Sequence, residues 1–154
     1  SQASLAGQSA GRTANTTGKT AWTMRYMGMD NAAIASALFA ALAADDAATV
    51  RRLCAADFTL VQNGGAPMGL EQLLRFNAAV HRVVPGFGYS EALCSSTTSG
   101  FVEEHVAGGT MADGNVLRLT LCVVADVTGG RVTQVREYFD SVAAAPLVAA
   151  LSRG

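Results

Sequence analysis

The sequence predicts an α+β fold, in which a cone-shaped, curved antiparallel or mixed sheet (an α+β barrel) wraps around N-terminal helices. Apolar residues recur at helical spacing in three segments between residues 30 and 83, and alternate at strand spacing from there to residue 140. Turns at 99–100, 113–114 and 129–130 divide the second part into four long strands. Because such strands cannot leave an apolar face bare, we expect the sheet to fold over the helices and enclose a pocket.

The helical part begins at Asp30, a side chain suited to an N-cap. After it, apolar residues recur every fourth position through Leu42, and a second short helix is expected after Asp45-Asp46. A short strand over 58–62 follows and ends in the turn 63–67. A third helix is predicted over about 70–83, where a proline and a glycine end it.

The remaining strands are predicted over 88–97, 101–111, 116–127 and 131–140, and a final helix from about residue 142. In the 116–127 strand, every odd position from Leu117 to Val123 is apolar and should face the core. The opposite face of this strand is mixed in character, as subunit interfaces are. We therefore expect a homodimer formed through the outer face of the sheet.

Length and composition favour a single domain over 30–154, preceded by an extension or arm over 1–29 that contains no Asp or Glu. The net charge of −1 gives no footprint for nucleic acid, and the apolar runs are too short to cross a membrane. Cys54, Cys94 and Cys122 form neither a zinc pattern nor a disulfide framework. We expect a cytoplasmic protein with no metal and no cofactor.

The last strand contains the most informative residue. Alternation places Val135, Glu137 and Phe139 on one face, so Glu137 is a carboxylate among apolar neighbours. Burying such a group is costly unless it has a partner or a task. Glu137 is therefore the first candidate for a catalytic residue.

The order of the elements, the Val-Gln-Asn-Gly turn at 61–64 and the Arg-Glu-Tyr-Phe-Asp ending at 136–140 resemble the nuclear transport factor two-like superfamily. Within it, the chain is similar to the limonene epoxide hydrolase and SnoaL-like polyketide cyclase branches over about residues 30–141. The resemblance to the epoxide hydrolase implies that Glu137 is the general base that activates water and that Asn63 orients this water. The tyrosine and the acid that complete the hydrolase site fall at Val61 and Ala107, so neither group is present.

Two polar residues of the 101–111 strand are candidates for the missing proton donor. Alternation places Glu103 and His105 on one face, which we expect to be the concave face that also carries Glu137. A carboxylate beside an imidazole, opposite a second carboxylate, separates pKa values into an acid and a base. We expect His105 with Glu103 to supply the proton or to stabilise charge. The alternative is a His105–Glu137 ion pair that only satisfies buried polar groups.

The expected pocket wall is almost entirely apolar, so the ligand or substrate should be a small hydrophobic molecule. Its residues are Leu38, Phe76, Phe101, Leu119, Leu121, Val135 and Phe139. The expected activity is water-mediated or acid–base chemistry resembling epoxide hydrolysis. Ketosteroid isomerase-like members would place an aspartate base at Asn63 and a second acid at Leu121 or Cys122, and the SnoaL-type aspartate belongs to the same strand as this second acid. None of these acids is present, which disfavours both chemistries. A polyketide cyclase or isomerase-like enzyme, or a non-catalytic protein that binds hydrophobic ligands, remains the alternative.

Overall fold

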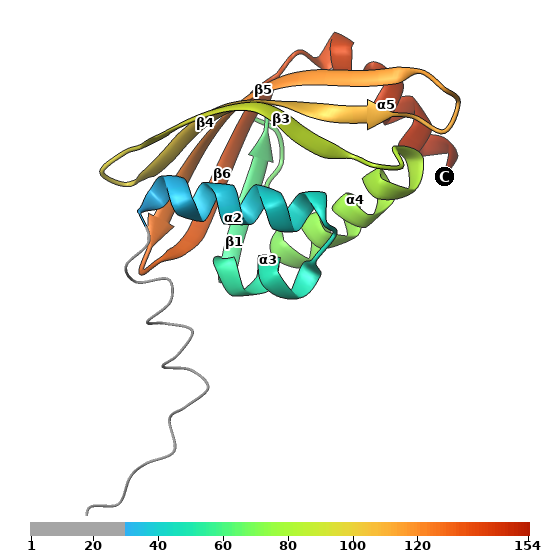
Figure 1. The fold of residues 1–154 in the computed structure, drawn as a ribbon. Helices are drawn as coiled ribbons and strands as arrows, with labels where there is room; N and C mark the ends of the chain where they lie inside the picture. Colours follow the sequence, from blue (N-terminus) through green and yellow to red (C-terminus); the bar gives the residue numbers. More distant parts are fainter. Residues whose placement is uncertain (1–29) are drawn as a thin grey trace, which may run out of the picture.

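The computed structural model describes residues 30–154, which form four helices and one six-stranded mixed sheet (Figure 1). The predicted arm over 1–29 lies outside the described residues. Within 30–154, no helix is long and apolar enough to cross a membrane. The elements are α2 (Asn31–Ala43), α3 (Ala47–Leu53), β1 (Cys54–Gln62), β2 (Met68–Gly69), α4 (Leu70–Val83), β3 (Gly88–Ser96), β4 (Gly100–Thr110), β5 (Val116–Thr128), β6 (Arg131–Phe139) and α5 (Ser141–Arg153).

The sheet has the strand order β2-β1-β6-β5-β4-β3, and it stays open. The meander β3 to β6 is antiparallel, whereas β1 lies parallel to β6. Figure 1 shows the strands arching over α2, with α4 and α5 toward the C-terminal end of the molecule. The predicted fold class, a curved mixed sheet over N-terminal helices, is confirmed, although the strands do not close into a complete barrel.

Most element bounds agree with the sequence prediction to within a few residues. β1 is the main exception, because it begins directly after α3 at Cys54 and not at Phe58. Its pairing with β6 is irregular between Cys54 and Thr59. Apolar and polar residues therefore do not alternate regularly in this part of the strand, and the sequence pattern does not reveal it. β2 was not predicted; its two residues pair only with β1.

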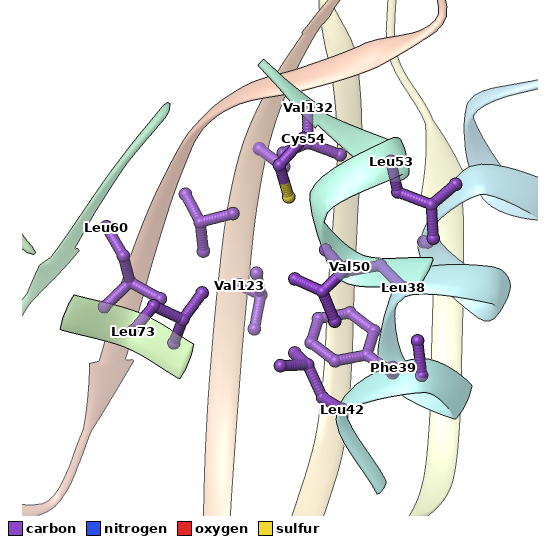
Figure 2. Close-up of a cluster of buried hydrophobic side chains, with 14 of the residues drawn as sticks. Leu38, Phe39, Leu42, Val50, Leu53, Cys54, Leu60, Leu73, Val123 and Val132 are labelled. Carbon is purple, nitrogen blue, oxygen red and sulfur yellow. The ribbon is translucent and has the colours of Figure 1, made fainter. Parts of the chain in front are cut away.

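The core lies between the concave face of the sheet and the helices α2 and α3 (Figure 2). α2 contributes Leu38, Phe39 and Leu42, and the sheet contributes buried residues such as Val123 and Val132. The odd positions of β5 from 117 to 125 are all buried, as the sequence predicts. This packing fills the side of the sheet near α2 and α3, and leaves room beneath α4 and α5.

A β-bulge in β3 changes which side chains of this strand face inward. The pairing of β3 with β4 shifts between Ser90 and Leu93, and Glu91 adopts a φ of 56°. The extra residue resets the alternation along the strand. As a result, Tyr89 lies opposite Ala107 and Cys94 lies opposite Glu103, so both share the inner face.

Candidate functional site

A cavity of about 150 Å³ lies between the concave face of the sheet and the helices α4 and α5. Its wall is apolar except for Gln62, Asn77, Tyr89 and Glu137. The apolar wall residues are Leu42, Leu60, Leu73, Phe76, Val80, Phe87, Ala107, Leu117, Leu119, Leu121, Phe139, Ala144, Leu147, Val148 and Leu151. A few polar groups converging in an apolar cavity are typical of a ligand-binding site.

Glu137 of β6 borders this cavity, half-buried between the apolar side chains of its own strand face. The side chain of Gln62, its neighbour on β1, donates a hydrogen bond from Nε2 to Oε2 of Glu137 at 3.1 Å. Desolvation raises the pKa of Glu137, while this hydrogen bond and the nearby charge of His105 lower it in part. A carboxylate with a raised pKa is a better proton acceptor than an ordinary glutamate.

Tyr89 of β3 also borders the cavity, a position that the pattern of the sequence does not predict. Burial raises the pKa of its phenol, and the negative charges of Glu137 and Glu103 raise it further. Tyr89 therefore keeps its proton and acts as a hydrogen-bond donor. Within residues 30–154 the hydroxyl has no hydrogen-bond partner, so it is available to a ligand. Tyr89 pairs with Ala107, the position at which the epoxide hydrolase carries its acid. A proton donor therefore lies next to the position of the absent acid.

Glu103 and His105 form a buried pair outside the cavity wall. Nδ1 of His105 lies 2.6 Å from Oε2 of Glu103, and the two residues are only 2% and 3% exposed, respectively. The imidazole ring packs against Phe39 and Tyr89, with centroid distances of 4.6 and 4.7 Å. Cys94 lies opposite Glu103 in the pairing of β3 with β4, and burial together with the charge of this carboxylate raises the pKa of the Cys94 thiol to about 11.

The alternative of a His105–Glu137 ion pair is wrong. Strand β5 separates β4 from β6, and Val123 stands between Glu103 and Glu137 in the register. The imidazole is instead paired with Glu103 on its own strand, two residues away. Nε2 of His105 is buried and has no hydrogen-bond partner within 30–154.

Asn63, which the resemblance placed on the catalytic water, lies elsewhere. It occupies the exposed turn after β1 with a φ of 50° and does not border the cavity. Its Nδ2 donates to the backbone oxygen of Phe139, and its Oδ1 accepts from the backbone nitrogen of Phe139, both at 3.0 Å. Its own backbone N–H donates to the carbonyl oxygen of Glu137 at 2.9 Å. Asn63 therefore holds the end of β6 in place.

Four of the seven expected wall residues border the cavity, namely Phe76, Leu119, Leu121 and Phe139. The other three, Leu38, Phe101 and Val135, are core residues that are at most 3% exposed. They lie in the part of the core that the cavity does not reach. In their place, α5 contributes one side of the wall, which the sequence did not indicate because the docking of this helix is a tertiary contact.

Of the polar wall residues that were not predicted, Asn77 could have been identified from the sequence and Tyr89 could not. Asn77 occupies the apolar stripe of α4 between Leu73 and Val80, and a polar residue on such a stripe is a readable signal. The face on which Tyr89 lies could not be predicted, because the bulge in β3 interrupts the alternation along this strand.

Within 30–154, no group of three or more His, Cys, Asp or Glu side chains is placed to hold a metal ion.

Residues 35–145 match the SnoaL-like domain family, and the chain belongs to this family. No curated protein matches the chain. Several solved structures resemble the chain in fold. IdmH from Streptomyces antibioticus, a proposed polyketide cyclase, is 20% identical with a TM-score of 0.68, over 80% of this chain and 99% of IdmH.

Two further solved structures share this fold. A proposed SnoaL-like polyketide cyclase from Jannaschia sp. CCS1 is 17% identical with a TM-score of 0.65, over 80% of this chain and 92% of its own. A protein with a ketosteroid isomerase-like fold from Catenulispora acidiphila, solved with trimethylamine, is 22% identical with a TM-score of 0.62. That match covers 70% of this chain and 85% of the other. At these identities the likeness shows a common fold.

Proposed function

We propose that this protein is a cyclase- or isomerase-type enzyme that moves a proton on a small, mostly apolar carbonyl compound. The observation that carries this proposal is that a carboxylate with a raised pKa, Glu137, and a protonated phenol, Tyr89, border the same apolar cavity. Groups whose surroundings separate their pKa values in this way act as base and acid. Membership of the SnoaL-like domain family supports the same class of reaction.

In the proposed reaction, Tyr89 donates a hydrogen bond to the carbonyl oxygen of the substrate. Glu137 removes a proton from the carbon next to the carbonyl, and the electron pair of this C–H bond forms the enolate double bond. Tyr89 stabilises the negative charge that develops on the oxygen. Return of the proton to another carbon completes an isomerisation, whereas attack of the enolate carbon on a second carbonyl closes a ring.

Epoxide hydrolysis has weaker support in this site. The reaction needs a water held between the base and further polar side chains. Both atoms of the Asn63 side-chain amide are occupied by the backbone of Phe139, and position 61 is a valine. Gln62 is the remaining amide beside Glu137, and it already donates to the carboxylate.

The Glu103–His105 pair is proposed to position Tyr89. The pair does not border the cavity, so it has no contact with a ligand in this cavity. Its imidazole packs at 4.7 Å against the phenol ring and thereby limits the tilt of Tyr89. Its role is therefore indirect, and His105 and Glu103 are assigned as positioning residues.

A homodimer through the outer face of the sheet is also proposed. This face exposes Leu93 and Tyr138, which are 70% and 49% accessible in the single chain. Both side chains are apolar or aromatic, a composition that suits the centre of an interface.

A location in the cytoplasm is proposed as well. The three cysteines are free thiols, which is compatible with a reducing compartment such as the cytoplasm.

The test is exchange of the α-protons of cyclic ketones such as tetralone for deuterium, followed by NMR. Exchange should fall by roughly 10²- to 10⁴-fold in Glu137→Gln and by roughly 10²-fold in Tyr89→Phe. Asp57→Asn is the control, since Asp57 is exposed on β1 and does not border the cavity, so this variant should exchange at the wild-type rate. Equal rates in wild type and Glu137→Gln would refute the base. Ligand binding with no exchange in the wild type would point to a non-catalytic binding protein.

A further inference from the structure

We infer that Asn77 presents a hydrogen-bond acceptor to the cavity, and that the substrate carries a hydroxyl or N–H group to meet it. Asn77 lies on α4, is 5% exposed and borders the cavity. Glu137 and Tyr89 border the same cavity from the sheet side. The inference rests on the proposed function only for the carbonyl group, which Tyr89 would bind.

The orientation of the Asn77 amide is dictated by its neighbours. Nδ2 donates to the backbone oxygen of Leu42 at 3.0 Å and to Oδ1 of Asp45 at 3.0 Å. Both partners are acceptors that carry no proton to give, so the amide cannot be turned around. The two N–H groups of Nδ2 are therefore both used, and Oδ1 is the atom left over.

No side chain or backbone group within 30–154 donates a hydrogen bond to Oδ1 of Asn77. An acceptor at a nearly buried position costs free energy when a ligand removes its water without replacing the hydrogen bond. A ligand that places a hydroxyl here gains this hydrogen bond, whereas an entirely apolar ligand does not. Asn77 is thus expected to select among carbonyl compounds of similar size.

The substrate class that fits all three groups is a compact cyclic carbonyl compound with a hydroxyl on the side away from its carbonyl. Its carbonyl would meet Tyr89, its acidic C–H would meet Glu137, and its hydroxyl would meet Asn77. The hydrophobic remainder would contact the apolar wall. Its volume is limited, since an apolar cavity of about 150 Å³ is known to hold a single benzene-sized ring, and any second ring would extend toward the exposed Val148.

The test compares tetralone with a series of tetralones that carry one hydroxyl at different ring positions, by calorimetric titration. At least one isomer should bind the wild type about tenfold more tightly than tetralone itself. In Asn77→Leu this preference should fall to within about twofold, with the affinity for tetralone kept. His81 also hydrogen-bonds the Leu42 oxygen, at 2.9 Å, and Asp45 is exposed, so the substitution leaves no buried group without a partner.

Asp45→Gly is the matched control. It removes one acceptor of the Asn77 amide but leaves Oδ1, and glycine suits the φ of 51° at this position. It should keep the preference for the hydroxylated isomer. The methyl ether of the preferred isomer tests the ligand side on the wild type alone, and should lose the tenfold gain because it has no proton to donate.

Three results would overturn the inference. They are no preferred isomer in the wild type, a preference that survives in Asn77→Leu, and a methyl ether that binds as tightly as its parent. Because binding is measured, the titrations can be repeated in Glu137→Gln, where the preference should persist. A failure of proton exchange would then affect the proposed function alone, and a missing preference would affect this inference alone.

Discussion

Two carboxylates occupy the same row of the sheet on the same inner face, and their surroundings are opposite. Glu103 on β4 and Glu137 on β6 are both paired with Val123 of β5, which lies between them. Glu103 is 3% exposed, and its charge faces the imidazole of His105 at 2.6 Å. Glu137 borders a cavity, and among residues 30–154 its carboxylate accepts a side-chain hydrogen bond only from the neutral amide of Gln62.

The difference shows that strand alternation determines the face of a side chain but not its role. α2 covers the sheet near Glu103, and its Phe39 packs on His105 at 4.6 Å. Near Glu137, the residues of α4 and α5 do not pack directly on the sheet, and a cavity lies between them and the strands. The covered carboxylate of Glu103 lies against the His105 ring. At Glu137, desolvation outweighs the Gln62 hydrogen bond and the charge of His105, so the pKa of this carboxylate is raised and it can accept a proton.

The largest expected effect comes from breaking the buried pair. His105→Phe leaves the Glu103 carboxylate buried without its partner, which should cost about 3–5 kcal/mol in the free energy of unfolding. Chemical denaturation at pH 7 measures this loss. The double variant Glu103→Leu/His105→Phe should recover most of it, because a buried ion pair replaced by apolar side chains is often neutral in stability.

The exposed pair Arg51–Glu71 is the control for this comparison, with a distance of 2.9 Å between Arg51 Nε and Glu71 Oε1. Arg51→Ala should leave the denaturation midpoint unchanged within error, since solvent screens exposed pairs. A single His105→Phe variant as stable as wild type would contradict the structural role of the buried pair.

A smaller effect is expected at the turn that holds Glu137 in place. Asn63→Gly keeps the left-handed backbone but removes both side-chain hydrogen bonds to Phe139. The loss should be about 1 kcal/mol in stability. The rate of α-proton exchange should also fall several-fold, because β6 then carries Glu137 less rigidly. A variant with unchanged exchange would show that the Asn63 clamp serves stability alone.

The smallest effect is a pH-dependent gain in stability from neutralising Glu137. Burial raises its pKa above the ordinary 4.5, so folding is favoured by the protonated carboxyl and this contribution is lost as the pH rises through the raised pKa. Glu137→Gln should therefore melt at a higher temperature than wild type at neutral pH. The difference should vanish below the ordinary pKa, where the wild-type carboxyl is protonated in both states. Scanning calorimetry across this pH range measures it, and a constant difference would contradict the assigned burial.

The fold and one part of the site could be read from local patterns. The helices, the meander and the inner face of β5 follow from apolar periodicity, which the backbone geometry of each element imposes on its own residues. Glu137 was found in this way, because a carboxylate on an apolar strand face stands out in any alternating sequence. Glu103 and His105 were placed on the correct face by the same argument.

The rest was decided by contacts between distant segments. Tyr89 reached the cavity through a bulge, Asn63 was drawn to the backbone of Phe139, and Leu38 was buried in the core and not in the pocket wall. Periodicity determines only which way a side chain points from its own strand or helix. Whether that side is covered by a helix or left open as a cavity depends on how α2, α4 and α5 pack on the sheet. This packing distinguishes a buried carboxylate–imidazole pair from a candidate catalytic base.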